Sequence, residues 1–128
     1  MDNKKIAVVT GGSRGIGKEI AVKLAEEAYV IVNYNGSEEK AAQVVREIKD
    51  KGGNAEAVKC NVASFKECEK FIGDIVERFG KIDILVNNAG IIKRIPMHEM
   101  SAADFRQVID IDLNGPFIVS KAVIPSMI

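Results

Sequence analysis

The chain has 128 residues, of which 47% are hydrophobic and 28% are charged, as is usual for one globular domain. Eighteen basic and eighteen acidic side chains cancel, so no net field attracts nucleic acid or an anionic membrane, and we expect neither as a partner. No apolar run approaches the roughly 18 residues of a membrane span, and no signal-peptide pattern is present at the start. We therefore expect a cytoplasmic protein.

The two cysteines, Cys60 and Cys68, are too few for a disulfide framework and do not have the spacing of metal ligands. We interpret both as packed thiols, with a reactive role as the alternative, because free cysteine is commonly buried. No metal is expected.

The first elements of the chain are a strand, a glycine-rich turn and a helix. The apolar run Ile6–Val9 predicts a short buried strand, and the segment Thr10–Gly17 follows it. The next apolar residues predict one face of a helix: Ile16, Ile20, Ala21, Leu24 and Ala25. This arrangement points backbone N–H groups and the positive end of a helix at a phosphate. Gly11 allows the sharp turn, and Gly15 and Gly17 leave room for a pyrophosphate and for the packed helix.

Two further strands and helices are predicted in the middle of the chain. Tyr29–Tyr34 is apolar and β-branched, and Ser37 caps the helix that follows. The inner face of that helix comprises Ala41, Ala42, Val44, Val45 and Ile48. Ala55–Cys60 predicts the third strand, and Ser64 with Glu67 predicts a capping box for the next helix. The apolar face of that helix comprises Cys68, Phe71, Ile72, Ile75, Val76 and Phe79.

The last part of the chain begins with Ile82–Val86, a continuous apolar run typical of the interior of a parallel sheet. His98, the only histidine, lies in a polar loop and is interpreted as a surface residue. Ser101 and Asp104 predict a capping box at the start of a final helix, which we expect to continue toward Met127. Its apolar residues are Phe105, Val108, Ile109, Leu113 and Phe117.

Strands and helices alternate along the whole chain, which predicts an α/β fold with right-handed parallel crossovers. The expected architecture is a partial, Rossmann-like doubly wound parallel sheet with strand order 3-2-1-4, in three α/β/α layers. The ligand should lie beyond the carboxyl ends of the strands, where the order reverses between the first and fourth strands.

Two motifs resemble those of a known family. Thr10–Gly17 has the spacing T-G-x-x-x-G-x-G, and Asn87–Gly90 follows the fourth strand as N-N-A-G. With Asn61-Val62, they resemble the classical short-chain dehydrogenase/reductase family, most closely its 3-oxoacyl-acyl-carrier-protein reductases. The resemblance runs over essentially the whole chain but covers the N-terminal half of such an enzyme. One departure is the turn before Tyr29, where relatives usually have a glycine and where we expect Ala28 to be strained by about 1 kcal/mol or more.

The expected cofactor is NADP(H). An NAD enzyme holds the ribose 2′-OH with an acid at the end of the second strand, whereas this chain has no acid there before Glu38. Arg14 can bind a phosphate bidentately, with a solvated loop charge as the alternative. Ser13, Asn35 and Ser37 can add neutral donors.

The resemblance implies further cofactor contacts. Asn61 and Val62 would meet the adenine, with a turn-forming Asn61 as the alternative, and Asn87 would tie adjacent strands together. The backbone after Asn87 would pass close to the nicotinamide ribose. The full predicted cofactor-binding set is Gly11, Gly12, Ser13, Arg14, Gly15, Ile16, Gly17, Asn35, Ser37, Asn61, Val62, Asn88, Ala89 and Gly90.

The catalytic groups implied by the resemblance are an Asn in the final helix, a Ser after a fifth strand, and a Tyr-x-x-x-Lys pair. Asp112 stands at the position of the Asn, and Asn114 lies two residues away, on a different side of the helix. Neither Tyr29 nor Tyr34 has a lysine four residues on. We therefore expect one nucleotide-binding domain, residues 1–128, that ends before the Ser and the Tyr-x-x-x-Lys and is inactive alone.

Two functions remain open. The first is the NADP(H)-binding half of a reductase that converts a 3-oxoacyl thioester to the 3-hydroxyacyl thioester in fatty acid biosynthesis, with an acyl-carrier-protein thioester as partner. The second is a non-catalytic nucleotide-binding or assembly module. Lys93-Arg94 is interpreted as a solvated pair, with recognition of an acidic carrier as the alternative. A homo-oligomer is expected in either case, because the fourth strand and the final helix lack cover.

Overall fold

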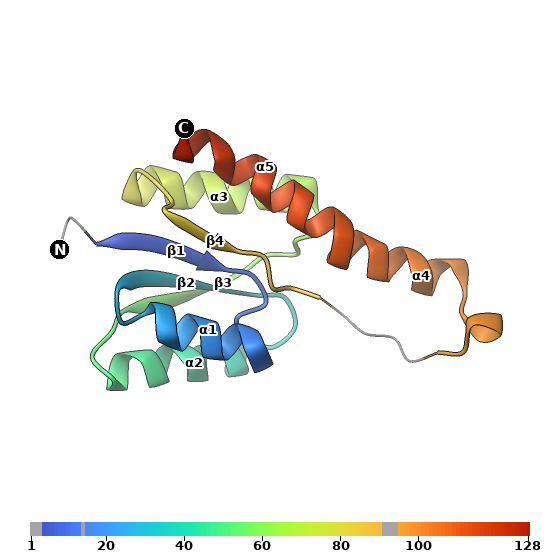
Figure 1. The fold of residues 1–128 in the computed structure, drawn as a ribbon, viewed down its shortest axis with the longest axis horizontal. Coiled ribbons are helices and arrows are strands. Elements are labelled where there is room, and N and C mark those ends of the chain that lie inside the picture. The colour runs from blue at the N-terminus through green and yellow to red at the C-terminus, as the bar shows by residue number, and fades with distance from the viewer. Residues whose placement is uncertain (1–3, 14, 91–94) are drawn as a thin grey trace.

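The computed structural model describes residues 4–13, 15–90 and 95–128. Four parallel strands form one sheet in the order β3-β2-β1-β4. The strands are β1 (Lys5–Val9), β2 (Ala28–Tyr34), β3 (Ala55–Lys59) and β4 (Ile84–Val86). Helices α1 (Gly15–Leu24) and α2 (Glu38–Asp50) cover one face, and α3 (Phe65–Phe79) and α5 (Gly115–Met127) cover the other (Figure 1). The predicted fold class and strand order are confirmed.

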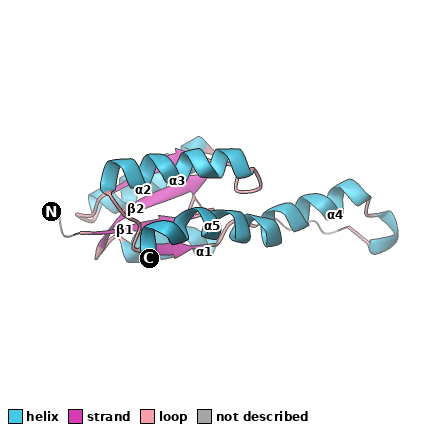
Figure 2. Ribbon diagram, turned by 90° about the horizontal axis from the view of Figure 1, so that it is seen from above, coloured by secondary structure: helices cyan, strands magenta, loops and turns pink. Residues whose placement is uncertain are grey.

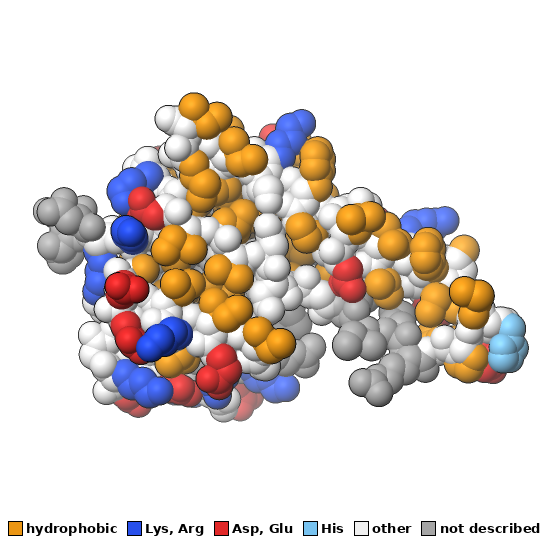
Figure 3. Space-filling model, in the orientation of Figure 1, with side chains coloured by type: hydrophobic (Ala, Val, Ile, Leu, Met, Phe, Trp, Pro, Cys, Tyr) orange, Lys and Arg blue, Asp and Glu red, His pale blue; other side chains and the backbone are white. Residues whose placement is uncertain are grey.

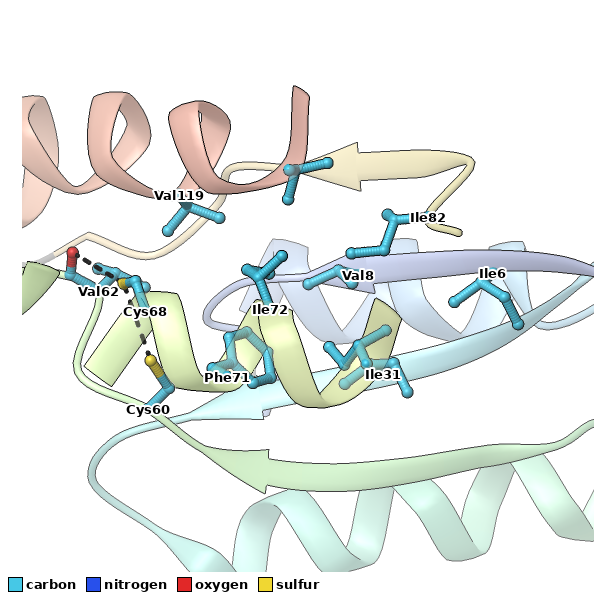
Figure 4. Close-up of a cluster of buried hydrophobic side chains, with 12 residues drawn as sticks. Ile6, Val8, Ile31, Cys60, Val62, Cys68, Phe71, Ile72, Ile82 and Val119 are labelled. Atoms are coloured by element: carbon cyan, nitrogen blue, oxygen red, sulfur yellow. Dashed lines mark hydrogen bonds between the residues drawn. The ribbon is translucent and has the colours of Figure 1, made fainter. Parts of the chain in front are cut away.

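Alternating side chains of the strands fill two separate cores, as the period of two in a strand requires. Ile6 and Val8 of β1 belong to the core beneath α3 and α5, where Figure 4 shows Val8 near Ile72. Ala7 and Val9 belong to the opposite core, beneath α1 and α2. The buried faces predicted for α2 and α3 are confirmed at Ala41, Val44, Ile48, Cys68, Phe71, Ile72 and Ile75.

The predicted face of α1 is wrong at its first member. Ile16 is 75% exposed, and the helix instead buries Gly17 and Ala21. Ile16 is the second residue of α1, next to the glycine turn, so it lies before the part of the helix that rests on the sheet. Its position directs it to solvent near the carboxyl edge of the strands.

The strain expected at Ala28 is absent. No described residue other than glycine has a positive φ, and Ala28 is the fully buried first residue of β2. The helix end tightens instead: Glu26 N donates to Lys23 O at 3.2 Å and Glu27 N to Leu24 O at 2.9 Å. These i→i+3 bonds turn the chain without a left-handed residue.

The final helix is interrupted, contrary to the expectation of one regular element. A short 3-10 helix (Met97–Glu99) precedes α4 (Ala102–Ile109), whose capping box at Ser101 and Asp104 is confirmed. A π-helical segment, Asp110–Asn114, then joins α4 to α5. Figures 1 and 2 show α4 extending away from the sheet as an arm, while α5 packs beside α3. Phe105 of this arm is 58% exposed and Leu113 is 63% exposed, so the predicted apolar face does not reach the core.

A polar cluster fastens the edge strand β3 to α3. Arg78 donates to both carboxylate oxygens of Glu56, at 2.7 and 2.5 Å, and Tyr29 OH donates to Glu56 at 2.8 Å. The Arg78 hydrogen bonds lower the pKa of Glu56, and burial with the Glu56 contact raises the pKa of Tyr29 to about 12. The cluster joins the start of β3 to the last turn of α3, at the opposite end of both elements from the connection between them. Among the helices of the described residues, none has both the length and the apolar character needed to cross a bilayer.

Candidate nucleotide-binding site

The turn after β1 is held between its two neighbouring strands. Thr10 N donates to Val86 O of β4 at 3.0 Å, and Gly12 N donates to Asn33 O of β2 at 3.0 Å. The start of the turn therefore lies at the carboxyl edge of the sheet, between β2 and β4. This is the position at which the strand order reverses.

Thr10 is a buried clamp that the residue pattern did not reveal. It is 1% exposed, and its Oγ1 accepts hydrogen bonds from Asn88 N at 2.9 Å and Ala89 N at 3.0 Å. Asn88 Nδ2 in turn donates to Gly11 O at 3.0 Å. The strand-tying role expected of Asn87 is wrong, because Asn87 Nδ2 donates to Ser120 Oγ of α5 at 3.1 Å. Thr10 and Asn88 join the strand ends instead.

Asn33 performs the matching task on the other side of the turn. Its side chain is buried; Oδ1 accepts from Gly11 N at 3.1 Å, and Nδ2 donates to Cys60 O at 3.0 Å. The sequence prediction assigned no role to the Asn33 side chain. An amide inside an otherwise apolar strand is the signal that could have identified it, because a buried polar group needs partners.

The glycines of the turn allow contacts that a Cβ would block. Gly11 has φ +63°, and a Cβ there would lie 2.7 Å from Ala89 Cα. A Cβ on Gly17 would collide with Gly11 O and with Asn88 Nδ2. Gly15 also has a positive φ, +59°, but has open space around it, so its conformation alone favours glycine. The backbone at this turn is closely packed at Gly11 and Gly17 and open at Gly15.

A cleft of about 420 Å³ opens along this edge of the sheet. Most of the predicted cofactor residues line it: Gly11, Ser13, Asn35, Ser37, Asn61, Val62, Asn88, Ala89 and Gly90. Gly12 lies behind the turn against Val9 and Val32. Gly15, Ile16 and Gly17 do not line the cleft, and Arg14 lies outside the described residues, as do Lys93 and Arg94. Unpredicted lining residues are Asn33, Tyr34, Gly36, Cys60, Gln107 and Ile111.

The cleft wall is neutral: no described residue that lines it is charged. Its polar groups are amides, hydroxyls and backbone. Ser37 caps α2 by accepting from Lys40 N at 3.2 Å, which leaves its hydroxyl proton able to donate. The first turn of α2 therefore presents its positive dipole end near this wall. Within the described residues, no group of acidic, His or Cys side chains could hold a metal ion.

Asn61 forms a turn, as the alternative interpretation had it. Its Oδ1 accepts from Ala63 N at 3.0 Å, and its backbone N donates to Glu67 Oε1 at 3.1 Å. The capping box predicted at Ser64 is therefore only half formed: Ser64 Oγ accepts from Glu67 N at 3.2 Å, while the Glu67 carboxylate binds Asn61. Asn61 and Val62 remain in the cleft wall, held by these bonds.

Asp112 lies at the mouth of the cleft. A Cβ on Gly90 would be 3.2 Å from Asp112 Oδ1, so the carboxylate faces the segment after β4. The neighbouring Ile111 lines the cleft. Asn114 does not replace the expected Asn, because its Nδ2 donates to Asp110 Oδ1 at 3.0 Å within the π-helical segment. His98 is exposed, as expected, and its Nε2 lies 3.9 Å from Glu99 Oε2.

Comparison with known proteins agrees with this geometry. The family model described as short chain dehydrogenase matches residues 5–128. The chain therefore belongs to the short-chain dehydrogenase family.

Three similar proteins illustrate the family. The 3-oxoacyl-[acyl-carrier-protein] reductase FabG of Staphylococcus epidermidis is 48% identical over 125 residues, 97% of this chain and 51% of the relative. The 2-dehydro-3-deoxy-D-gluconate 5-dehydrogenase of Formosa agariphila is 46% identical over 97% of this chain and 47% of its own length. A metagenomic short-chain oxidoreductase in complex with NADP is 35% identical with a TM-score of 0.91, over 99% of this chain and 58% of that one. The chain thus spans about half the length of the curated relatives that it matches.

Removal of the Thr10 hydroxyl should destabilise the turn after β1 and the segment after β4. Thr10→Val keeps the side-chain shape but leaves the N–H groups of Asn88 and Ala89 without their acceptor, which should lower the free energy of unfolding by about 1–3 kcal/mol. Urea unfolding measures that loss, and amide hydrogen exchange at the two N–H groups should accelerate. Thr10→Ser retains the acceptor and should keep most of the stability. Equal stability of the Val and Ser variants would contradict the assigned clamp.

Proposed function

We propose that this chain supplies the NADP(H)-binding half of a short-chain reductase. The observation that carries the proposal is the neutral cleft at the carboxyl edge of β1, β2 and β4, bounded by the glycine turn. Parallel α/β sheets bind nucleotides at this position. The cradle fits a dinucleotide, because its wall combines the backbone of the glycine turn with the neutral hydroxyl and amide groups of Ser13, Asn35 and Ser37.

Different residues of the cleft would bind different parts of the cofactor. Ser13 and the turn, with Arg14, would hold the phosphates; Asn35, Gly36 and Ser37 would surround the ribose that carries the 2′-phosphate. Asn61 and Val62 would hold the adenine, and Asn88, Ala89 and Gly90 the nicotinamide ribose. A bound nicotinamide cofactor supplies the hydride for reduction of a carbonyl. The chain's own residues bind and orient it.

The substrate that we propose is a 3-oxoacyl thioester on an acyl carrier protein, reduced to the 3-hydroxyacyl thioester as a step of fatty acid biosynthesis. The similarity to the Staphylococcus epidermidis reductase supports this assignment. The chain is also similar to the Formosa agariphila dehydrogenase, so a keto sugar acid is the second substrate to compare with the 3-oxoacyl thioester.

One observation favours the alternative, a non-catalytic nucleotide binder. Asp112, beside Gly90, places a carboxylate near the point where negative charge would develop on the substrate oxygen. An ionised carboxylate is an acceptor only and cannot stabilise an oxyanion by donating. The turn before Tyr29, which also departs from the family, is unstrained at Ala28 and favours neither function.

NADPH should bind more tightly than NADH, because no described cleft residue is acidic. Arg14→Ala should reduce the NADPH affinity by about 1–3 kcal/mol if the contact is charge-assisted. Asn35→Asp should weaken the binding free energy of NADPH by about 1 kcal/mol or more, because the new carboxylate would repel the 2′-phosphate. Like unit charges about 4 Å apart repel by that much even in water. Titration calorimetry at fixed ionic strength measures both changes in NADPH affinity. Arg46→Ala, at an exposed position of α2, is the charge-matched control for Arg14→Ala. Equal affinities for NADPH and NADH in the unmodified chain would refute the assignment.

We also infer that the chain forms a homo-oligomer through the arm, the π-helical segment and the first turn of α5. Hydrophobic side chains gather along the arm in Figure 3, and Phe105 of the arm, Leu113 of the π-helical segment and Phe117 of α5 are each more than half exposed. Exposed apolar patches of this kind mark association surfaces. Phe117→Glu should shift the chain toward monomer in sedimentation velocity, whereas Lys49→Glu, an exposed position on α2, should not. A monomeric unmodified chain would contradict the inference.

The chain of 128 residues should bind NADPH without reducing acetoacetyl thioesters. A positioned acid is worth about 10²–10⁴ in rate, and no tyrosine of the chain precedes a lysine at the family spacing. NADPH oxidation is followed for the chain alone and after mixing with a separately expressed C-terminal half of a relative. Gly17→Ala is the control for cofactor-dependent signal, because its Cβ would collide with Gly11 O. Turnover by the chain alone would refute the proposal, and turnover only on mixing would support the reductase over the non-catalytic binder.

A further inference from the structure

The two cysteines are neighbours in the fold. Cys60 follows β3 and Cys68 lies in the first turns of α3, and their Sγ atoms are 3.9 Å apart. Figure 4 shows the two sulfurs facing each other across the connection between the two elements. Both residues are buried, with exposed fractions of 1% and 0%. The pair is therefore placed within reach of a single bond.

The same connection forms one wall of the cleft. Cys60 lines the cleft, and its carbonyl accepts from Asn33 Nδ2, the amide that also binds Gly11 N. Cys68 Sγ lies 3.7 Å from Asn61 O and 3.5 Å from Val62 O. The pair therefore contacts the residues that we assign to the adenine directly, and the backbone of Cys60 is joined to the glycine turn through Asn33.

We propose that Cys60 and Cys68 are an oxidisable pair whose intramolecular disulfide weakens nucleotide binding in the adjacent cleft. An S–S bond is about 2.05 Å long, so the sulfurs must approach by roughly 1.9 Å from their separation of 3.9 Å. Part of that movement comes from side-chain rotation and part from the connection itself. The effect on nucleotide rests on the proposed cofactor; formation of the disulfide does not.

The oxidant that completes the chemistry is a small peroxide, which reaches the pair from the cleft at Cys60, whose sulfur is 3.9 Å from the Cys68 sulfur. The hydrogen bond between the thiols lowers the pKa of Cys68, and the same bond with burial raises the pKa of Cys60, so Cys68 ionises first. Its thiolate attacks the O–O bond, which breaks to give the sulfenic acid and, after proton uptake, one water. Cys60 then attacks the Cys68 sulfur; the S–S bond forms, the S–O bond breaks, and the second water leaves. Two thiols thereby give two electrons and two protons to the peroxide.

Formation of the disulfide is tested first and without nucleotide. The reduced chain is treated with hydrogen peroxide, quenched, unfolded and alkylated with iodoacetamide for intact-mass analysis. The treated chain should carry no alkyl groups and should lack two hydrogen atoms, whereas the untreated chain carries two alkyl groups. Cys68→Ala should keep Cys60 alkylatable and remain monomeric in mass. Two alkyl groups on the treated unmodified chain would overturn the proposal.

Nucleotide affinity is then compared between the two states. Oxidation should weaken NADPH binding roughly tenfold, within the 5–150-fold range typical of coupled sites, and dithiothreitol should restore it. Cys68→Ala should bind NADPH equally before and after peroxide. By linkage, saturating NADPH should shift the disulfide equilibrium in a dithiothreitol buffer toward the thiols by the same factor. Disulfide formation with unchanged NADPH affinity would overturn the coupling, while failure of the reduced chain to bind NADPH would refute the proposed function separately.

Discussion

The arrangement of the candidate site depends on close backbone contact at the turn after β1. Gly11 leaves no room for a Cβ against Ala89, and Gly17 leaves none against Gly11 O. Such contact buries backbone N–H and C=O groups, which must then be paired. The side chains of Thr10 and Asn33 provide partners, one toward β4 and the other toward β2. The two polar residues and the two glycines form one packing unit.

The alternation of apolar strands and helices predicted the strand order, and the glycine spacing predicted the turn after β1. The family resemblance implied the cleft residues that follow β3 and β4. The sequence did not reveal whatever depends on the pairing of one side chain with a distant backbone. Thr10 binds Asn88 and Ala89, which are 78 and 79 positions further along the chain. No local sequence pattern predicts such a bond. Asn87 was expected to tie adjacent strands and the Glu67 side chain to bind locally at Ser64, but Asn87 binds Ser120 and the Glu67 carboxylate binds Asn61 in the fold. The strain expected at Ala28 failed for the opposite reason, since a local turn of i→i+3 bonds could replace the missing glycine.

The interruption of the final helix also has a physical explanation. The sequence showed a helical period but not where one extra residue would be accommodated. Gly115 packs with its Cα side against Val62, where a Cβ would be 2.9 Å from Val62 Cγ2. The π-helical turn before it widens the helix by one residue, which lets α5 lie on α3 while α4 leaves the body. The exposed Phe105 is the consequence of that departure.

Val62 therefore joins two parts of the molecule that the chain order separates. It is buried against the start of α5, it lines the cleft, and its carbonyl lies beside Cys68. The connection from Cys60 to Ser64 is thus restrained by the glycine turn through Asn33, by α5 through Gly115 and by α3 through Glu67. Close-packed protein interiors transmit strain. We therefore expect a change at the cysteine pair to reach the cleft, although neither sulfur is exposed.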